Sequence, residues 1–173
     1  MRRFVSPVLL AGLLAGCALP PAPEPSSVAA GLKIEQFLAG RTLADGVFRN
    51  SLTGKERRLH AILDGSWDDR TLTLREEFRF DDGARDRKTW RLTRNPDGTW
   101  TGLREDVIGT AKGVQDGASF RLSYEASLAS QGSDTIVHFE DVLTLTDRRT
   151  VLNKAVVSKF GVAVGEVTLT IRR

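Results

Sequence analysis

The sequence predicts an all-β fold, an up-and-down antiparallel barrel of about ten strands preceded by a short helical turn. From residue 41 onward, apolar and polar residues alternate with a period of two, which is the pattern of strands with one dry face. Residues that favour tight turns interrupt this alternation at short intervals. The links between strands are too short for the crossover connections that parallel pairing requires, so consecutive strands must pair antiparallel.

The first expected element is a helical turn within residues 29–37, where apolar residues such as Ile34 and Phe37 recur near helical spacing. The clearest turns lie at residues 81–83 and 95–98, where Asp, Asn and Gly tolerate the backbone of a tight hairpin. The expected strands are 41–49, 55–65, 71–80, 86–94, 99–108, 111–114, 119–128, 135–146, 151–160 and 162–171.

A meander of this length is expected to close on itself, because closure removes the exposed edge strands that would recruit other chains. Barrels of this connectivity are lipocalin-like or calycin-like. A sandwich of two sheets is the alternative.

The N-terminus has the features of an export signal. Arg2 and Arg3 precede an apolar run of about ten residues, which is too short to span a membrane. The run ends in Leu-Ala-Gly-Cys at Cys17, which resembles the lipobox of bacterial lipoproteins, where the cysteine is acylated and the chain is cut before it. We therefore expect a lipoprotein signal peptide at 1–16, a proline-rich tether at 17–28 and the barrel domain at 29–173. The expected location is the bacterial cell envelope, in the outer membrane and facing the periplasm.

The charge balance argues against a nucleic-acid partner. The 173 residues carry a formal net charge of +3. Removal of residues 1–16 takes away Arg2 and Arg3 and leaves 23 Lys and Arg against 22 Asp and Glu. Such a domain lacks the basic face that phosphate neutralisation requires.

Aromatic side chains recur on the dry faces of the expected strands and would line the interior of the barrel. Two carboxylates share these faces, since Glu76 lies between Leu74 and Phe78, and Asp141 follows Phe139 in the same phase. The candidate ligand-binding residues are therefore Trp67, Glu76, Phe78, Trp90, Trp100, Phe120, Tyr124, Phe139 and Asp141. Lys88 is in phase with Trp90, and Arg104 and Asp106 share a parity with Trp100 in a strand whose faces are ambiguous.

A lone buried carboxylate costs several kcal/mol, so each of these groups needs a partner or water. One interpretation is an internal cluster of ion pairs with a structural role, or a bulge that turns a charge outward. The other is a polar anchor that orients a ligand inside a mostly apolar cavity. The sequence leaves both open.

Catalytic and metal-binding patterns are sparse. His60 and His138 fall on the polar faces of their strands, and the pair His138 and Glu140 lacks a visible third metal ligand. Neither a nucleophile elbow nor a phosphate loop is present. Acylation of Cys17 would leave no thiol for disulfides or catalysis. No cofactor, metal or enzymatic activity is expected, with an uncharacterised hydrolase as the remaining enzymatic alternative.

Five short stretches, in their order and spacing, resemble the family of bacterial lipoproteins known as domain of unknown function 3833. They are Phe37-Leu38-Ala39-Gly40, Leu63-Asp64-Gly65-Ser66-Trp67, Phe80-Asp81-Asp82-Gly83, Asp106-Val107-Ile108-Gly109 and Lys159-Phe160-Gly161. The resemblance runs from about Phe37 to Ile171 and implies a signal-bearing envelope protein with a barrel-like domain. It implies no catalytic residue and no cofactor.

Two functions fit these expectations. In the first, a barrel anchored to the membrane through acylated Cys17 binds a small apolar or amphipathic ligand. In the second, a structural or protein-interaction lipoprotein has a barrel filled by its own side chains. The interior volume discriminates them, since ligand cavities start at about 300 Å³.

Overall fold

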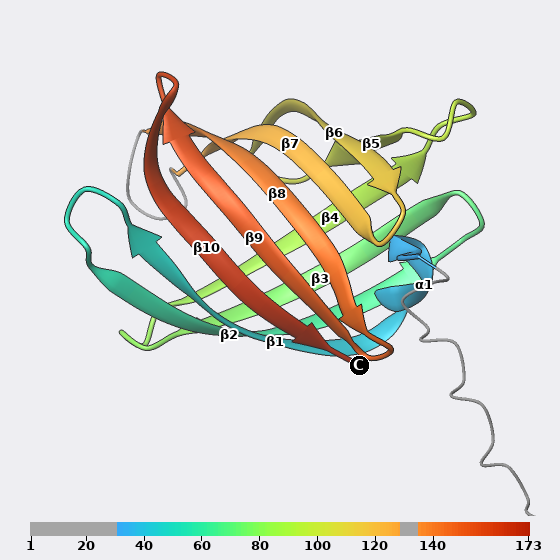
Figure 1. Ribbon diagram of the computed structural model, residues 1–173, viewed down its shortest axis with the longest axis horizontal. Coiled ribbons are helices and arrows are strands. Elements are labelled where there is room, and N and C mark those ends of the chain that lie inside the picture. Colours follow the sequence, from blue (N-terminus) through green and yellow to red (C-terminus); the bar gives the residue numbers. More distant parts are fainter. Residues whose placement is uncertain (1–30, 129–134) are drawn as a thin grey trace, which may run out of the picture.

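The computed structural model describes residues 31–128 and 135–173. The expected signal peptide, the tether and Cys17 lie outside these residues. A single helical turn, α1 (Ile34–Phe37), is followed by ten strands (Figure 1). The strands are β1 Gly40–Asn50, β2 Glu56–Trp67, β3 Thr71–Phe80, β4 Arg85–Arg94, β5 Trp100–Leu103, β6 Val107–Asp116, β7 Ser119–Ser127, β8 Ile136–Asp147, β9 Thr150–Lys159 and β10 Val162–Arg172.

The strands form one closed antiparallel barrel in which each strand pairs with the next in sequence. β1 and β10 complete the ring, with their register running from Leu43 opposite Arg172 to Asn50 opposite Gly165. This confirms the predicted up-and-down barrel and rules out the sandwich.

The prediction was wrong between residues 99 and 116. One strand was expected at 99–108 and another at 111–114, but the chain turns at 104–106 and then continues as the single strand β6. The turn is closed by the Val107 amide, which donates to the Arg104 carbonyl at 3.1 Å. Gly109, with φ of 72°, lies in a register shift between Ile108 and Lys112. The glycine therefore bends β6 without ending it.

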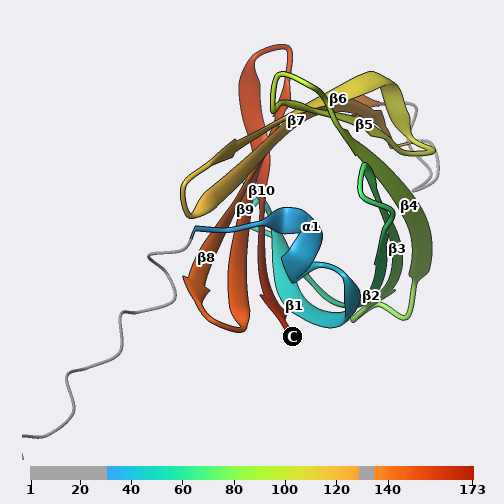
Figure 2. The same ribbon diagram turned by 90° about the vertical axis from the view of Figure 1, so that its right-hand side faces the viewer.

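α1 lies across one end of the barrel and closes it (Figure 2). Ile34 of this turn is fully buried and Leu38 is nearly so. β2 accommodates the turn at Gly65, because any Cβ there would overlap the Leu38 carbonyl oxygen. At the C-terminal end of the chain, Arg173 donates to the carbonyls of Gln36 at 2.9 Å and Ala39 at 3.2 Å. Packing and these bonds hold α1 in place.

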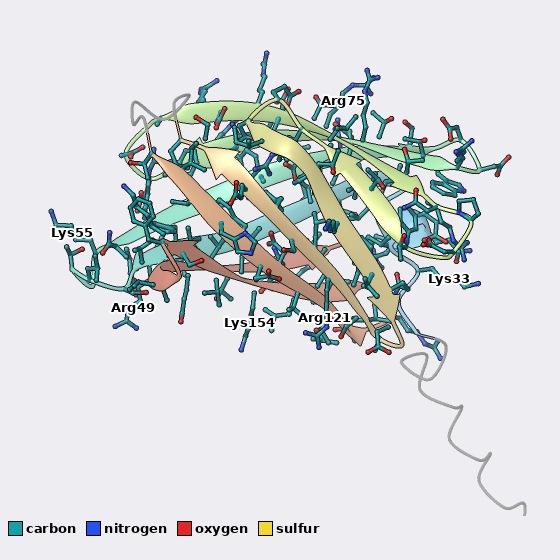
Figure 3. All side chains as sticks on the ribbon, turned by 90° about the horizontal axis from the view of Figure 1, so that it is seen from above. Lys33, Arg49, Lys55, Arg75, Arg121 and Lys154 are labelled. Carbon is teal, nitrogen blue, oxygen red and sulfur yellow. The ribbon has the colours of Figure 1, made fainter. Side chains whose placement is uncertain are left out.

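The outer face of the barrel is densely charged. Side chains such as Arg75, Arg121 and Lys154 project away from the strands (Figure 3). This matches the alternation in the sequence, since the apolar residues of the same strands form the buried core. The described residues contain no helix long and apolar enough to cross a membrane.

Candidate ligand cavity

The barrel encloses a cavity of about 490 Å³. Ile34 and Leu38 border it at the end closed by α1, and Asn50, Arg57 and Lys159 border it at the opposite end. Every strand except β5 and β6 contributes to its lining, together with the turn at residues 104–106. The volume exceeds the roughly 300 Å³ at which ligand cavities start, so the barrel is not filled by its own side chains.

Three aromatic rings form one wall of the cavity. Trp90 contacts Tyr124 edge-on, with ring centroids 5.0 Å apart. Tyr124 and Phe139 stack nearly parallel, also at 5.0 Å. These geometries are the favoured ones for aromatic pairs, so the three rings hold one another in place.

Most of the predicted ligand-binding residues lie together in the cavity. Its lining includes Glu76, Phe78, Trp90, Phe120, Tyr124, Phe139 and Asp141. Trp67 and Trp100 do not line it but contact one another, with ring centroids 5.8 Å apart. Trp100 is buried in the core. Strand alternation therefore predicted its burial correctly but could not show that it does not line the cavity.

Charged side chains meet inside the cavity, and we call Glu76, Asp86, Lys88, Arg104 and Asp106 the ionic cluster. Lys88 Nζ lies 3.1 Å from Asp86 Oδ2 and 3.1 Å from Asp106 Oδ2. Arg104 Nε lies 2.7 Å from Asp106 Oδ1. Burial alone would raise the pKa of Asp106, but these two cations hold it below its ordinary value.

The turn between β5 and β6 delivers two members of the ionic cluster. Glu105, between Arg104 and Asp106, points the other way and accepts a hydrogen bond from the Thr89 amide at 2.9 Å. That amide lies on β4 beyond the reach of β5, which pairs with β4 only as far as Arg91. Glu105 therefore bonds, on the outside of the barrel, the part of β4 that β5 does not pair with. Its neighbours Arg104 and Asp106 point into the cavity.

Arg104 is buried against the aromatic wall. Its guanidinium lies 4.5 Å from the ring centroid of Trp90 and 5.1 Å from that of Tyr124, as in cation–π contacts. Burial would lower the pKa of Arg104, but the acidic groups around it, Tyr124 and Glu76 first among them, raise that pKa above its ordinary value. The side chain is therefore a permanent buried cation.

Glu76 is the least satisfied member of the ionic cluster. Its Oε2 atom lies 4.0 Å from Arg104 Nη1, which is too far for a hydrogen bond, and this buried oxygen has no hydrogen-bond partner. Burial raises the pKa of Glu76 to about 7, and Arg104 offsets only part of the rise. The carboxyl group can therefore exchange its proton near neutral pH.

A second polar group lies across the cavity. Asn153 Nδ2 donates to Asp141 Oδ1 at 2.8 Å, and the Tyr124 hydroxyl also bonds Asp141. Burial raises the pKa of Asp141 and of Tyr124, and the two hydrogen bonds offset part of this for Asp141. Because the amide nitrogen of Asn153 is used by the carboxylate, its Oδ1 is directed elsewhere and has no partner.

The cavity thus has acceptors that the chain leaves without donors. Four carboxyl groups and four cations line it, with Arg57 and Lys159 at the end opposite α1, and two buried oxygens, Glu76 Oε2 and Asn153 Oδ1, lack a donor. A buried acceptor without a donor costs about 1–3 kcal/mol, so a bound molecule that supplies N–H or O–H groups would gain this energy. The bulge interpretation of Glu76 is wrong, because the residue pairs in regular register with Lys88 and points inward.

Some cavity residues escaped the sequence prediction. Asn153 shares its parity with the buried residues Val151 and Ala155, a signal that was available. Lys88 was noted in phase with Trp90 but was not included among the candidates. Arg104 and Asp106 lie in a turn, where strand parity no longer applies.

The histidines lie elsewhere. His60 Nδ1 lies 2.8 Å from Asp45 on the outer face, and His138 Nε2 lies 2.7 Å from Glu140. Neither histidine lines the cavity. Among the described residues no group of three His, Cys, Asp or Glu side chains is arranged to hold a metal ion.

Solved structures are similar to this chain. The S-type phycobiliprotein lyase CPES from Guillardia theta superposes with a TM-score of 0.61 at 9% sequence identity, covering 87% of this chain and 98% of the lyase. The EF1p2_mFAP2b protein bound to DFHBI gives a TM-score of 0.48 at 12% identity, with 86% and 99% of the two chains covered. The redesigned β-barrel mFAP0 bound to DFHBI gives 0.44 at 14% identity, with 80% and 100% covered.

At such low identities the likeness to the lyase shows the lipocalin-like barrel fold alone. No match was found among curated proteins. The family model described as protein of unknown function (DUF3833) matches residues 11–173, and the chain therefore belongs to this family.

Proposed function

We propose that this protein binds a small amphipathic molecule inside its barrel. The observation that carries the proposal is the cavity of about 490 Å³ that contains two buried acceptors without donors. A purely structural ionic cluster would satisfy its own members, because a half-satisfied polar network is less stable than an apolar core. The two unpartnered oxygens instead suit a partner that comes from outside.

The apolar part of the ligand would lie against the wall formed by Trp90, Tyr124 and Phe139. Aliphatic side chains such as Leu63 and Leu74 complete this lining toward α1. A mostly apolar cavity with a few convergent polar groups is the usual form of a small-molecule site.

The polar head of the ligand would be a hydrogen-bond donor, such as an amine or an alcohol. Glu76 Oε2 and Asn153 Oδ1 would accept its N–H or O–H groups. A carboxylate head bound at these two atoms would lie beside the carboxyl groups of Glu76 and Asp141, whereas Arg57 and Lys159 of the lining lie at the end opposite α1. Like charges in a buried site repel strongly, so an anionic head is disfavoured.

The test is a displacement series with one tail and three heads. The fluorescent probe 1-aminoanthracene is bound to the full chain and then displaced by dodecylamine, dodecanol or dodecanoate at pH 7. We expect the amine and the alcohol to displace the probe at least about tenfold more effectively than the carboxylate, which corresponds to one charge-assisted hydrogen bond.

Ala155→Phe places a ring inside the cavity and should abolish binding of all three compounds. Lys154→Phe places the same ring on the outer face of β9 and is the matched control. Failure of the wild-type chain to bind the probe would overturn the proposed function. Preference for dodecanoate would overturn only the head-group assignment.

We further propose that the barrel is a lipoprotein of the bacterial outer membrane, attached through Cys17 and facing the periplasm. The support is the sequence pattern at residues 1–17, in which two arginines and a short apolar run end in a lone cysteine.

A further inference from the structure

Two hairpins at the end of the barrel opposite α1 carry the most exposed large apolar side chains of the described residues. Phe160 is 95% exposed, Leu52 is 73% exposed and Val162 is 60% exposed. Leu52 belongs to the β1–β2 hairpin and the other two to the β9–β10 hairpin. We call these three residues the hairpin tips.

The two hairpins are neighbours in space, because closure of the barrel pairs β1 with β10. The Ser51 amide donates to the Val164 carbonyl at 3.0 Å, which ties one hairpin to the other. The hairpin tips thus belong to two adjacent hairpins, formed by residues about a hundred positions apart in the sequence.

Phe160 adopts a backbone conformation that its residue type disfavours. Its φ is 51°, and the following Gly161 has a φ of 78°. Asn and Gly are the residues that suit such a turn, whereas a bulky residue with positive φ is strained. The ring is almost wholly exposed, so packing within the fold does not compensate for this strain. A strained backbone that holds an aromatic ring in solvent indicates that the ring contacts another molecule.

The two hairpins border the end of the cavity opposite α1. Lys159 and Val164 of one hairpin, and Asn50 of the other, line the cavity as well. No described helix covers this end, whereas α1 covers the other (Figures 1 and 2). Whatever contacts the hairpin tips therefore also faces the cavity.

The charges of the two hairpins are mainly positive. Over residues 49–58 and 158–166 there are five Arg and Lys against two Glu, and one of the five, Arg57, is paired with Asp82 of the adjacent β3–β4 hairpin at 2.7 Å. Arg49 and Lys55 lie at this end, opposite Lys33 near α1 (Figure 3). Lys159 Nζ lies 5.5 Å from the ring centroid of Phe160. Apolar tips surrounded by cations are the composition that binds the interface of an anionic membrane.

We propose that the hairpin tips dock the open end of the barrel onto an anionic phospholipid bilayer. Phe160, Leu52 and Val162 enter the boundary between headgroups and acyl chains, while Arg49, Lys55 and Lys159 face the lipid phosphates. The mouth of the cavity then opens onto the lipid, so an amphipathic molecule could pass between bilayer and barrel without crossing water. The docking itself does not depend on the identity of the ligand.

The test uses the full chain with Cys17→Ser, so that acylation cannot contribute. Binding to phosphatidylcholine vesicles is compared with binding to vesicles of phosphatidylcholine and phosphatidylglycerol by flotation. Leu52→Ser, Phe160→Asn and Val162→Thr are combined in one variant, in which Asn suits the positive φ of position 160. We expect this variant to lose at least about tenfold in vesicle affinity, and we expect the parent to prefer the anionic vesicles.

The matched control combines Leu43→Ser, Val114→Thr and Val156→Thr, which remove three half-exposed apolar groups elsewhere on the barrel. It should bind vesicles as the parent does. Equal vesicle binding by the two triple variants overturns the proposal. Failure of the parent to bind any vesicle also overturns it, and this is the result expected if the hairpin tips bind a protein instead. The hairpin variant should still bind 1-aminoanthracene in solution, which separates this outcome from a failure of the cavity to bind ligands.

Discussion

Glu76 is a carboxyl group whose ionisation opposes folding. Its pKa is raised by burial from the ordinary 4.5 to about 7. As the pH rises above 4.5, the unfolded chain loses this proton before the folded chain does, so folding becomes less favourable. The penalty grows up to about pH 7 and is then constant, at about 3 kcal/mol if the whole shift is expressed.

Glu76→Gln should remove this pH dependence. Because glutamine cannot ionise, the free energy of unfolding of the variant, relative to that of the wild type, should rise by about 2–3 kcal/mol between pH 5 and pH 8. Urea unfolding of both proteins at the two pH values measures the difference. Glu77→Gln is the matched control, since Glu77 is exposed next to Arg87 and should give no such gain. If the difference in free energy of unfolding between the wild type and Glu76→Gln does not change with pH, the proton exchange assigned to this carboxyl group is contradicted.

Individual cavity residues could be predicted where strand alternation held. Glu76 and Asp141 stood out because each interrupts an apolar face within a regular strand. Arg104 and Asp106 could not be assigned in the same way, because an inward-facing turn brings them into the cavity. Their partner Lys88 lies on another strand, and such pairing across strands depends on register that the sequence does not state.

At the scale of elements, the stability of α1 depends more on its contact with one position of β2 than on its own sequence. The turn has only four helical residues and its N-cap, Lys33, makes no side-chain capping bond. An isolated helix of this length does not persist in water. Its stability comes from buried Ile34 and from the close approach of the Leu38 carbonyl to Gly65.

Gly65→Ala should therefore displace α1 and open the closed end of the barrel. The added methyl group would overlap the Leu38 carbonyl, and relief of such overpacking typically costs about 1–3 kcal/mol. Urea unfolding gives the stability, and amide hydrogen exchange at Leu38 reports on α1. Ser66→Ala alters the exposed neighbour on β2 and should leave both unchanged. Normal protection of Leu38 in Gly65→Ala would show that α1 is not seated on this glycine.

The strand boundaries were predictable where turns contained Gly, Asp or Asn at hairpin positions. β3 matches its expected range, and most others differ by one or two residues. The exception is the region of β5 and β6, where Gly109 resembles a strand break but is a bend within β6. A glycine with positive φ suits both roles, so local sequence cannot distinguish them.

At the scale of the whole molecule, the two ends of the barrel differ in structure. The described chain begins beside α1, and the C-terminus lies there too (Figure 1). The hairpin tips lie at the opposite end. A membrane anchor at Cys17 would thus attach the closed end of the barrel, and the proposed docking surface would remain at the other end.

Cys17→Ser should release the protein from cell membranes. Multiple acyl chains hold a lipoprotein almost permanently, since each buried methylene contributes about 0.8 kcal/mol, whereas three docking side chains bind reversibly. After an alkaline carbonate wash of membranes, wild type should stay in the pellet and Cys17→Ser should be in the supernatant. An uncleaved, soluble wild-type chain would contradict the lipoprotein assignment.

The pairing of β1 with β10 has a consequence for assembly of the barrel. Every other pairing joins consecutive strands, so nine strands can pair before the C-terminal strand is in place. Until β10 pairs with β1, the sheet has two free edges and encloses nothing. A chain that stops before Val162 would therefore be an aggregation-prone open sheet, and the cavity is formed only when the last strand is added.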